Sequence, residues 1–165
     1  GSDIANLMPA VVRGFDGFDI HVDAIVGPGF SDPQEHSIRT AAEEVSAEVS
    51  VARDPNDLVD RMFQADFAVS TASSTTCELL ALGTPIISVP VADNQEPIAR
   101  SLRERDAADV LERGANREEF RNSVQTYVST PEPRRAYRNL GQQLVDCRGT
   151  ERICGEILSI AESKT

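Results

Sequence analysis

The sequence predicts a three-layer α/β domain in which helices cover both faces of a mainly parallel sheet. Its 165 residues are enough for one domain that buries a core without disulfides or a metal. Short apolar segments that stop at glycine, proline or hydroxyl residues alternate with segments of helical periodicity. Since this alternation, with short connections, places parallel strands between two helical layers, we treat residues 1–165 as a single domain of this class.

The first half of the chain predicts two strand–helix units and a further strand. Residues 19–26 mix apolar and β-branched side chains and stop at Gly27-Pro28-Gly29, which predicts a strand that runs into a tight loop. A helix beginning at Asp54-Pro55 has its apolar stripe at Leu58, Val59, Met62 and Phe63. The other elements predicted here are a Glu-rich helix over 32–44, a weaker strand over 45–51 and a short buried strand over 67–69.

The second half begins with a strand–loop–helix–strand unit. A helix over 73–82 is ended by Gly83, and Pro85 restarts an extended segment over 86–89. The elements predicted after it are a helix over 95–104, a strand over 108–111 and helices over about 116–129, 132–146 and 150–162, of which the last three are interrupted only at 131–133.

Charge narrows the choice of partners. The chain has 27 acidic and 16 basic residues, a net charge of −11, and Lys164 is its only lysine. Nucleic acids and anionic lipids are bound through basic patches, so we expect neither as a partner. An acidic, arginine-rich surface is tolerated at molar salt, where the Debye length falls to about 3 Å, and we therefore expect a halophilic source.

The apolar segments and the cysteines predict no membrane span and no metal site. The longest apolar stretch, residues 86–92, is interrupted by Pro90 and is too short to cross a bilayer. We recognise no signal or transit segment and expect a cytoplasmic protein. Cys77, Cys147 and Cys154 lack metal-ligand spacing and predict free, mostly buried thiols. We expect no metal and no cofactor.

The loop over residues 70–76 carries the main functional signal. It joins a buried strand to a helix with small and hydroxyl side chains only, Ser-Thr-Ala-Ser-Ser-Thr-Thr. Such a loop leaves the first N–H groups of the helix accessible, and together with the helix dipole they form an anion site that needs no lysine. A structural alternative is capping, because Thr75 and Glu78 fit the spacing of a capping box.

The next helix start shows the same ambiguity. Asp93 and Glu96 repeat the capping-box spacing, and Asn94 and Gln95 lie in the first turn between them. Amide side chains in that position either cap the helix or contact the hydroxyl groups of a sugar. Both loops follow predicted parallel strands, and ligands of open α/β sheets bind beyond the carboxyl ends of the strands.

The run from Asp66 to Gln95 resembles the C-terminal domain of GT-B-type enzymes. The resemblance is carried, in order, by Glu78, Leu82-Gly83, Pro85 and Asp93-Asn94-Gln95. It is closest to the UDP-sugar hydrolases of pseudaminic acid biosynthesis, and more distantly to the GlcNAc transferase that makes lipid II. Weaker similarities at Gly1-Ser2-Asp3 and over 145–152 extend it across nearly the whole chain. It implies a Rossmann-like fold and the C-terminal half of a longer two-domain enzyme, whose N-terminal domain lies on the same or a separate chain.

The resemblance also implies roles for individual residues. Ser73, Ser74, Thr75 and Thr76 match the loop that holds the diphosphate of a UDP-sugar through backbone N–H groups, and Glu78 matches the carboxylate that binds the ribose hydroxyls. The match also places Asp93, Asn94 and Gln95 in the substrate site, where Asn94 and Gln95 face the sugar.

The sequence departs from the family in two places. Ala72 and Ser73 stand where the family has a glycine pair, which lets the backbone approach the phosphates. The family also has a strand, central in its sheet, just before the loop that matches residues 1–3. Either that strand belongs to a longer protein, or Gly1-Ser2 is a cloning remnant and the likeness there is accidental.

Other residues carry weaker signals. Gly29 either admits a ligand or shapes a turn, and we include it in the predicted site. His21 in a strand and His36 on a helix have no partner motif and predict structural or solvated histidines. Arg53-Asp54 lies at the binding edge, where Asp54 before Pro55 favours an ordinary helix start.

The sequence offers no convincing catalytic acid or base, and in the resembled families that group comes from the N-terminal domain. We therefore expect the isolated chain to bind a UDP-sugar without turning it over, as half of an enzyme that hydrolyses the UDP-sugar or transfers its sugar. Two alternatives remain at this point: a UDP-sugar 2-epimerase domain, and a non-catalytic docking subunit for a separate catalytic or membrane chain, which predicts an exposed apolar patch.

Overall fold

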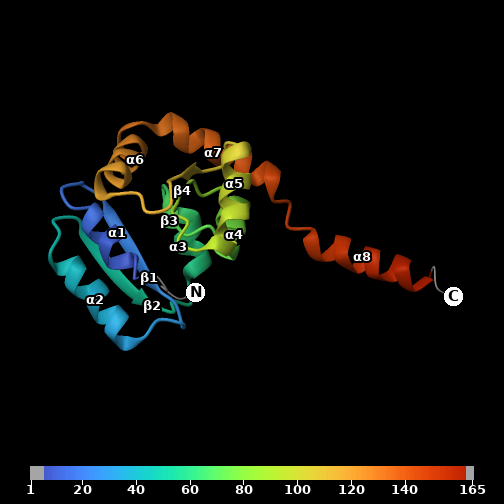
Figure 1. Ribbon diagram of the computed structural model, residues 1–165, viewed down its shortest axis with the longest axis horizontal. Helices are drawn as coiled ribbons and strands as arrows, with labels where there is room; N and C mark the ends of the chain where they lie inside the picture. Colours follow the sequence, from blue (N-terminus) through green and yellow to red (C-terminus); the bar gives the residue numbers. More distant parts are fainter. Residues whose placement is uncertain (1–5, 163–165) are drawn as a thin grey trace.

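The computed structural model describes residues 6–162, which form a layered α/β body and one projecting helix (Figure 1). All described strand pairs are parallel. The strands are β1 (His21–Val26), β2 (Glu48–Arg53), β3 (Ala68–Ser70), β4 (Ile86–Ser88) and β5 (Asp109–Val110). The helices are α1 (Met8–Gly14), α2 (Asp32–Glu43), α3 (Leu58–Gln64), α4 (Ser74–Leu82), α5 (Glu96–Glu104), α6 (Arg117–Ser129), α7 (Pro131–Leu144) and α8 (Gly149–Glu162), with a 3₁₀ turn, η1 (Asp93–Gln95), before α5.

The sheet is divided into two pieces, with strand orders β1-β2 and β3-β4-β5. In the first piece His21 pairs with Glu48 and Val26 with Arg53. In the second, Ala68 pairs with Ile86. The parallel sheet predicted from the sequence is confirmed, whereas its division between β1 and β3 was not part of that prediction.

One helical layer is shared by both pieces of the sheet. On one face, Val22 of β1 and Val69 of β3 pack against a cluster that contains Phe15, Phe120 and Val124, from the end of α1 and from α6. On the other face a second cluster joins α4 and α5 to β3 and β4; its buried members are Leu79, Leu80, Ile86, Leu102, Ala107 and Ala108. A third cluster packs α1 and α2 on β1; its buried members are Val12, Ala24, Val26, Phe30, Ile38 and Ala41.

The link from α4 to β4 shows how local sequence fixes the fold. Gly83 ends α4 in the left-handed region with φ 74°, as the sequence predicts, and β4 follows it. A Cβ atom at Gly83 would also lie 2.9 Å from the Gln142 side chain of α7, so glycine lets α7 pack closely here. β4 is wholly buried, and the Tyr127 hydroxyl of α6 donates to the Ile86 carbonyl over 3.1 Å.

Most predicted elements lie within a few residues of the observed ones, but helix α1 was missed and two boundaries were wrong. α3 begins at Leu58 instead of Asp54, because Asp54 adopts a positive φ of 43° that ends β2 in a turn. Val59 and Phe63, predicted to face the core, are 62% and 57% exposed, and the other two members of the α3 stripe, Leu58 and Met62, are only half-buried. β2 extends to Arg53 instead of ending at Val51.

Two predictions about burial are also corrected. The strand at 67–69 was predicted to be buried, yet all three residues of β3 are only half-buried because one edge of this strand is unpaired. The three cysteines are free, as predicted, but all are exposed, since Cys77 lies on the outer face of α4 and the other two lie at or beyond the end of α7. Gly1-Ser2-Asp3 lies outside the described residues.

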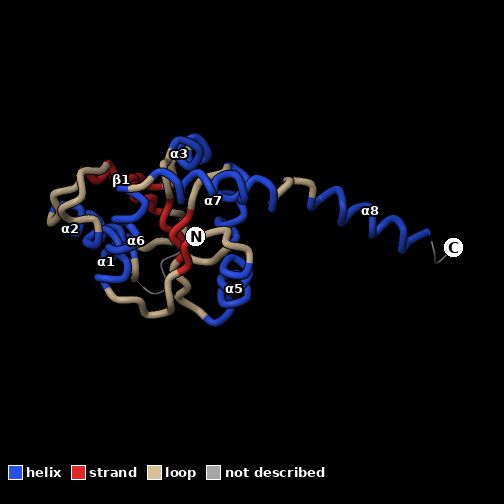
Figure 2. Tube along the Cα trace, turned by 90° about the horizontal axis from the view of Figure 1, so that it is seen from above, coloured by secondary structure: helices blue, strands red, loops and turns tan. Residues whose placement is uncertain are grey.

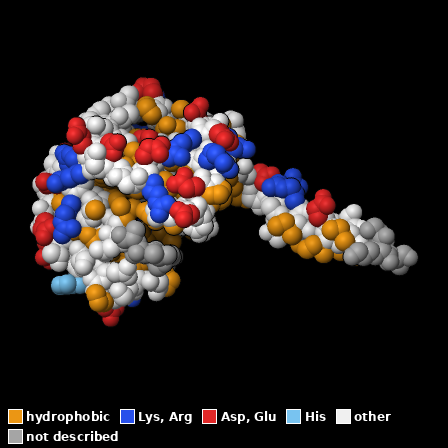
Figure 3. All heavy atoms as spheres, viewed as in Figure 1, with side chains coloured by type: hydrophobic (Ala, Val, Ile, Leu, Met, Phe, Trp, Pro, Cys, Tyr) orange, Lys and Arg blue, Asp and Glu red, His pale blue; other side chains and the backbone are white. Residues whose placement is uncertain are grey.

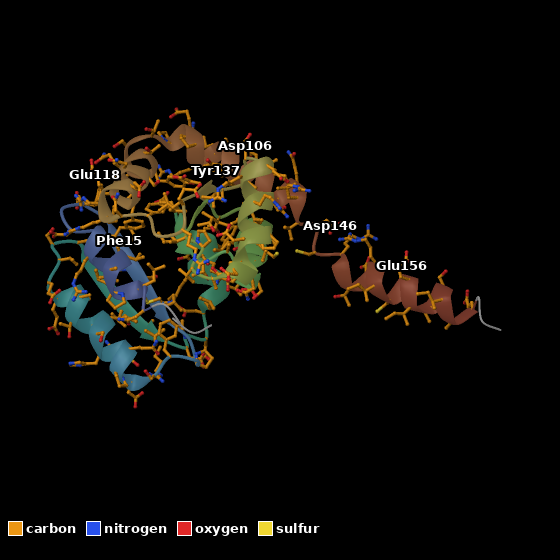
Figure 4. All side chains as sticks on the ribbon, viewed as in Figure 1. Phe15, Asp106, Glu118, Tyr137, Asp146 and Glu156 are labelled. Carbon is orange, nitrogen blue, oxygen red and sulfur yellow. The ribbon has the colours of Figure 1, made fainter. Side chains whose placement is uncertain are left out.

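Helix α8 extends away from the body in two perpendicular views (Figures 1 and 2). Asp146 lies at the junction and Glu156 lies well out on the helix (Figure 4). Apolar side chains gather along one side of α8 (Figure 3), where Ile153, Ile157 and Leu158 are each more than 60% exposed. Within residues 6–162 no helix is both long and apolar enough to cross a membrane.

Candidate functional site

The predicted site lies where β3 and β4 end. Ser70 and Ser88, the last residues of these strands, are paired in register, and the Val89 N–H donates to the Ser70 carbonyl over 2.9 Å. The loop that leads to α4 and the loop that leads to η1 therefore leave the same edge of the sheet beside each other. This is the carboxyl edge, where parallel α/β sheets bind their ligands.

The loop before α4 is held by its own hydrogen bonds. Ser73 is the N-cap residue, with φ −130° and ψ −173°, and its N–H donates to the Thr71 carbonyl over 2.8 Å and to Thr76 Oγ1 over 3.3 Å. Thr76 Oγ1 in turn donates to the Thr71 carbonyl over 3.2 Å, and its side chain is buried. Thr76 thus shapes the loop, and its hydroxyl is already engaged.

The open groups at this helix start belong to Ser74 and Thr75. They occupy the first two positions of α4, where backbone N–H groups have no acceptor inside the helix. Ser74 is exposed and Thr75 is half-buried. Among the described residues, these two N–H groups and the two hydroxyl groups of Ser74 and Thr75 have no hydrogen-bond partner.

Glu78 does not cap the helix. The capping box forms between Ser73 and Thr76, so the Thr75–Glu78 pair considered from the sequence is wrong; α4 starts two residues earlier than that pair requires. Glu78 is the fifth residue of α4 and is exposed. The described part of the chain gives it no hydrogen bond or ion pair, which leaves a free carboxylate one turn from the open N–H groups.

The loop after β4 brings Asp93, Asn94 and Gln95 to the same edge. The Val91 N–H donates to Gln95 Oε1 over 2.9 Å, so Gln95 braces its own loop and keeps its amide N–H groups for other partners. Asn94 is exposed, and Asp93 pairs with Arg113 from the loop after β5. The Asp93–Glu96 capping box, one of the two alternatives left open by the sequence, does not form: the Glu96 N–H donates to the Asp93 carbonyl.

Arg113 is a residue of this edge that the sequence analysis missed. It follows β5 and carries the positive charge that meets Asp93. The usable signal was its place directly after a predicted strand, because loops after parallel strands converge on one edge.

Gly29 and Arg53 lie at the end of the other piece of the sheet. Gly29 is exposed in a turn that a hydrogen bond from the Phe30 N–H to the Gly27 carbonyl closes over 3.1 Å. Arg53 donates to the Phe30 carbonyl over 3.1 Å. It also donates to the Glu35 carboxylate, and this second hydrogen bond is the main cause that lowers the pKa of Glu35. Arg53 therefore ties the loops after β1 and β2 together, and the structure does not bring Gly29 onto the sheet piece that carries α4.

The two histidines, predicted to be structural or solvated, both lie at the surface. His21 Nε2 lies 3.3 Å from Asp23 and its Nδ1 lies 3.6 Å from Glu48, while His36 is exposed on α2. An open depression of about 450 Å³ adjoins His21 and is lined by residues 17–21 and 46–48. It lies at the amino end of β1 and β2, the opposite edge from the predicted site.

The structural comparisons concern the fold. No protein-family model matches the chain, and no curated protein matches it. MurG of Acinetobacter baumannii is similar with a TM-score of 0.65, at 16% sequence identity over 87% of this chain and 46% of its own length. WaaG, a glycosyltransferase involved in lipopolysaccharide biosynthesis, is similar with a TM-score of 0.62, at 13% identity over 88% of this chain and 41% of its own. The chain thus spans less than half the length of either protein, and its fold is the Rossmann-like α/β fold of a GT-B glycosyltransferase domain.

Proposed function

We propose that the chain binds the diphosphate and ribose of a UDP-sugar at the start of α4, as one half of a GT-B enzyme. The observation that supports this most is the state of the α4 start: the loop caps itself through Ser73 and Thr76, and within residues 6–162 Ser74, Thr75 and Glu78 have no side-chain partner. These groups lie at the edge of a Rossmann-like sheet where ligands bind.

The chemistry of the free groups suits a nucleoside diphosphate. The N–H groups of Ser74 and Thr75, with the positive end of the helix dipole behind them, stabilise phosphate oxygens without a lysine. The Glu78 carboxylate accepts hydrogen bonds from two vicinal ribose hydroxyls, and such charge-assisted bonds are about twice as strong as neutral ones. Asn94 and the amide N–H groups of Gln95 remain for the sugar.

Ala72 and Ser73, which stand where the family has two glycines, affect how closely a phosphate can approach the loop more than they affect the conformation of the backbone. Ser73 adopts an extended conformation that needs no glycine. The Ala72 side chain is wholly buried, so it packs under the loop. A phosphate therefore approaches a loop of the expected conformation that carries one extra hydroxymethyl group, and we expect moderate affinity.

The proposed reaction of the whole enzyme is hydrolysis of a UDP-sugar or transfer of its sugar, with the α4 start stabilising the departing UDP. The resemblance to the hydrolases of pseudaminic acid biosynthesis favours hydrolysis. The catalytic acid or base is expected from the other domain, so incubation of the 165-residue chain with UDP-N-acetylglucosamine should release no UDP above the buffer rate. Turnover by the isolated chain would contradict this division of labour.

Calorimetric titration at molar salt tests the binding site. UDP should bind more tightly than UMP, because only UDP places a second phosphate at the helix start. Glu78→Ala removes charge-assisted hydrogen bonds worth about 1.5–3 kcal/mol and should weaken UDP binding about 10–150-fold. Glu43→Ala, at an exposed and unpaired glutamate on α2, is the matched control and should bind as the parent does. Equal affinities for Glu78→Ala and Glu43→Ala would rule out the ribose assignment.

The docking-subunit alternative has one observation in its favour. It predicts an exposed apolar patch, and the apolar side of α8 is such a patch. In a two-domain enzyme the same patch could contact the other domain, so the patch does not distinguish the two functions. Binding of a nucleotide does, because a docking subunit needs no UDP site. A chain that binds neither UDP nor UMP would favour docking.

A further inference from the structure

An ion pair joins the two loops that follow β4 and β5 at the carboxyl edge of the sheet. Arg113 Nη1 donates to Asp93 Oδ1, although the two residues lie 20 positions apart in the chain. Val110, the last residue of β5, is in register with Ser88, the last residue of β4. The two loops therefore leave the edge side by side, and the ion pair connects them beside η1.

The loop after β5 presents Arg113 on a closed turn. A hydrogen bond of 2.9 Å from the Ala115 N–H to the Glu112 carbonyl closes this turn. Gly114, the third residue of the turn, adopts a φ of 83°, which suits glycine. Arg103 of α5 pairs with Glu112 over 3.3 Å. The turn and its link to α5 therefore fix the point from which the Arg113 side chain extends.

Asp93 is held at the start of η1. Its carbonyl accepts from the Glu96 N–H, and the Gln95 N–H donates to the Ala92 carbonyl over 3.0 Å. Among the described residues, only Oδ1 of the Asp93 carboxylate has a hydrogen-bond partner. Arg113 therefore sets the orientation of this carboxylate and leaves Oδ2 as an acceptor.

The contribution of this pair to stability does not explain it. The side chains of Arg113 and Asp93 are 51% and 93% exposed, and exposed ion pairs contribute little to folding. The pair does place hydrogen-bond donors next to an acceptor: within residues 6–162, Nε and Nη2 of Arg113 and Oδ2 of Asp93 have no hydrogen-bond partner. A sugar hydroxyl both donates and accepts, and its hydrogen bonds to charged groups are about twice as strong as those to neutral ones.

We propose that Arg113 is a positioning residue for the sugar: it fixes the Asp93 carboxylate so that Oδ2 accepts a hydrogen bond from a hydroxyl of the bound UDP-sugar. This inference rests on the proposed function, because it places the sugar beside η1 while the start of α4 holds the diphosphate. Without Arg113 the exposed carboxylate rotates in water, and the ligand must order it on binding at a cost in affinity.

Calorimetry at molar salt with the 165-residue chain tests this role. The ligands are UDP and the UDP-sugars of glucose, galactose, N-acetylglucosamine and N-acetylgalactosamine. For the sugar that binds most tightly, the dissociation constant of UDP divided by that of the UDP-sugar gives the sugar ratio, which measures what the sugar adds to binding. Arg113→Gln should lower the sugar ratio about 2–12-fold, as for the loss of one hydrogen bond, and leave the affinity for UDP unchanged.

Arg100→Gln is the matched control for the loss of charge. Arg100 is an exposed arginine of α5 with no hydrogen bond or ion pair in the described part of the chain. Its replacement removes the same positive charge and should keep the parental sugar ratio.

A double-mutant cycle shows whether Arg113 acts through Asp93. Asp93→Asn should lower the sugar ratio at least as much as Arg113→Gln does, and Arg113→Gln should have no further effect in the Asp93→Asn chain. Arg113→Lys keeps a positive charge beside Asp93 and should retain most of the sugar ratio. Additive effects of the two substitutions would overturn the inference.

The other outcomes separate this role from a phosphate contact, from a role in folding and from failure of the proposed function. An equal loss of affinity for UDP and the UDP-sugar in Arg113→Gln would place Arg113 at the phosphates and overturn the inference. A sugar ratio no greater than one for every sugar in the parent chain, or a lower urea midpoint in the variants that lose the ratio, would overturn it as well. A parent chain that binds no UDP would instead contradict the proposed function, and this inference with it.

Discussion

Thr76 offers a quantitative test of how the α4 loop is built. Its buried hydroxyl accepts from the Ser73 N–H over 3.3 Å and donates to the Thr71 carbonyl over 3.2 Å. Thr76→Val replaces the hydroxyl by a methyl group of similar shape and removes both hydrogen bonds, each worth about 0.5–1.5 kcal/mol. The Ser73 N–H keeps its 2.8 Å bond to the Thr71 carbonyl, so neither partner is orphaned. We therefore expect Thr76→Val to lower the free energy of unfolding by about 1–3 kcal/mol.

Thr76→Ser is the matched variant, because it keeps the hydroxyl and loses only a buried methyl group. Its cost should be about 1 kcal/mol. Urea denaturation at molar salt, followed by circular dichroism, gives both values if the denaturant slopes are equal. Titration with UDP on the same samples should show near-parental affinity for Thr76→Ser and weaker binding for Thr76→Val, since only the second loosens the loop. A Thr76→Val chain more stable than the Thr76→Ser chain would refute the view that this hydroxyl holds the loop.

Three further predictions concern the binding loop and the charge of the chain. Ser73→Gly should tighten UDP binding several-fold in calorimetry, because it removes a side chain from the path of the phosphate. As a change of the N-cap residue it should cost only a few tenths of a kcal/mol of stability. Weaker binding would show that the Ser73 side chain assists the ligand. Hydrogen bonds from Arg53 and then Arg39 hold the pKa of Glu35 below its ordinary value, so this carboxylate stabilises the fold above about pH 4.5 and loses that effect as the pH falls through its lower folded-state pKa. Denaturation at molar salt between about pH 5 and pH 3 should therefore show a smaller loss for Glu35→Gln than for the parent, and equal losses would exclude this contribution. At low salt the net charge of −11 is unscreened, and the thermal midpoint should fall; a midpoint independent of salt would argue against a halophilic source.

The fold was predictable from the sequence where local signals agree with tertiary ones. Gly83 and Pro85 mark the end of one element and the start of the next, and α4 and β4 lie where they predict. Helix α1 escaped because its seven residues hold too little periodicity to separate from a loop. The boundary of α3 was misplaced because Asp54-Pro55 has the composition of a helix start, while the turn that follows β2 fixes Asp54 at positive φ. The conformation of Asp54 is fixed by how β2 and α3 pack in the fold, and no local sequence pattern encodes it.

The sequence predicted which loops meet at one edge of the sheet, but not the contacts within them. The rule that loops after parallel strands meet at the carboxyl edge predicted that Ser73–Glu78 and Asp93–Gln95 lie on one edge, and the structure brings these loops there. The spacing could not tell which hydroxyl would cap α4, because Ser73, Ser74, Thr75 and Thr76 all have the required chemistry. Packing decided it by burying Thr76. Arg113 was missed because its partner lies 20 residues away along the chain.

The proposed anion site, built from backbone groups, fits the charge of this protein. A lysine-based site attracts its ligand over several ångströms, and at molar salt, where the Debye length is about 3 Å, that attraction is screened away. Hydrogen bonds from the Ser74 and Thr75 N–H groups act at contact distance and survive the screening. The long-range repulsion between UDP and a chain of net charge −11 is screened by the same salt. We therefore expect UDP affinity to rise from low to molar salt, the opposite of a site that depends on lysine, so one titration series against salt distinguishes the two kinds of site.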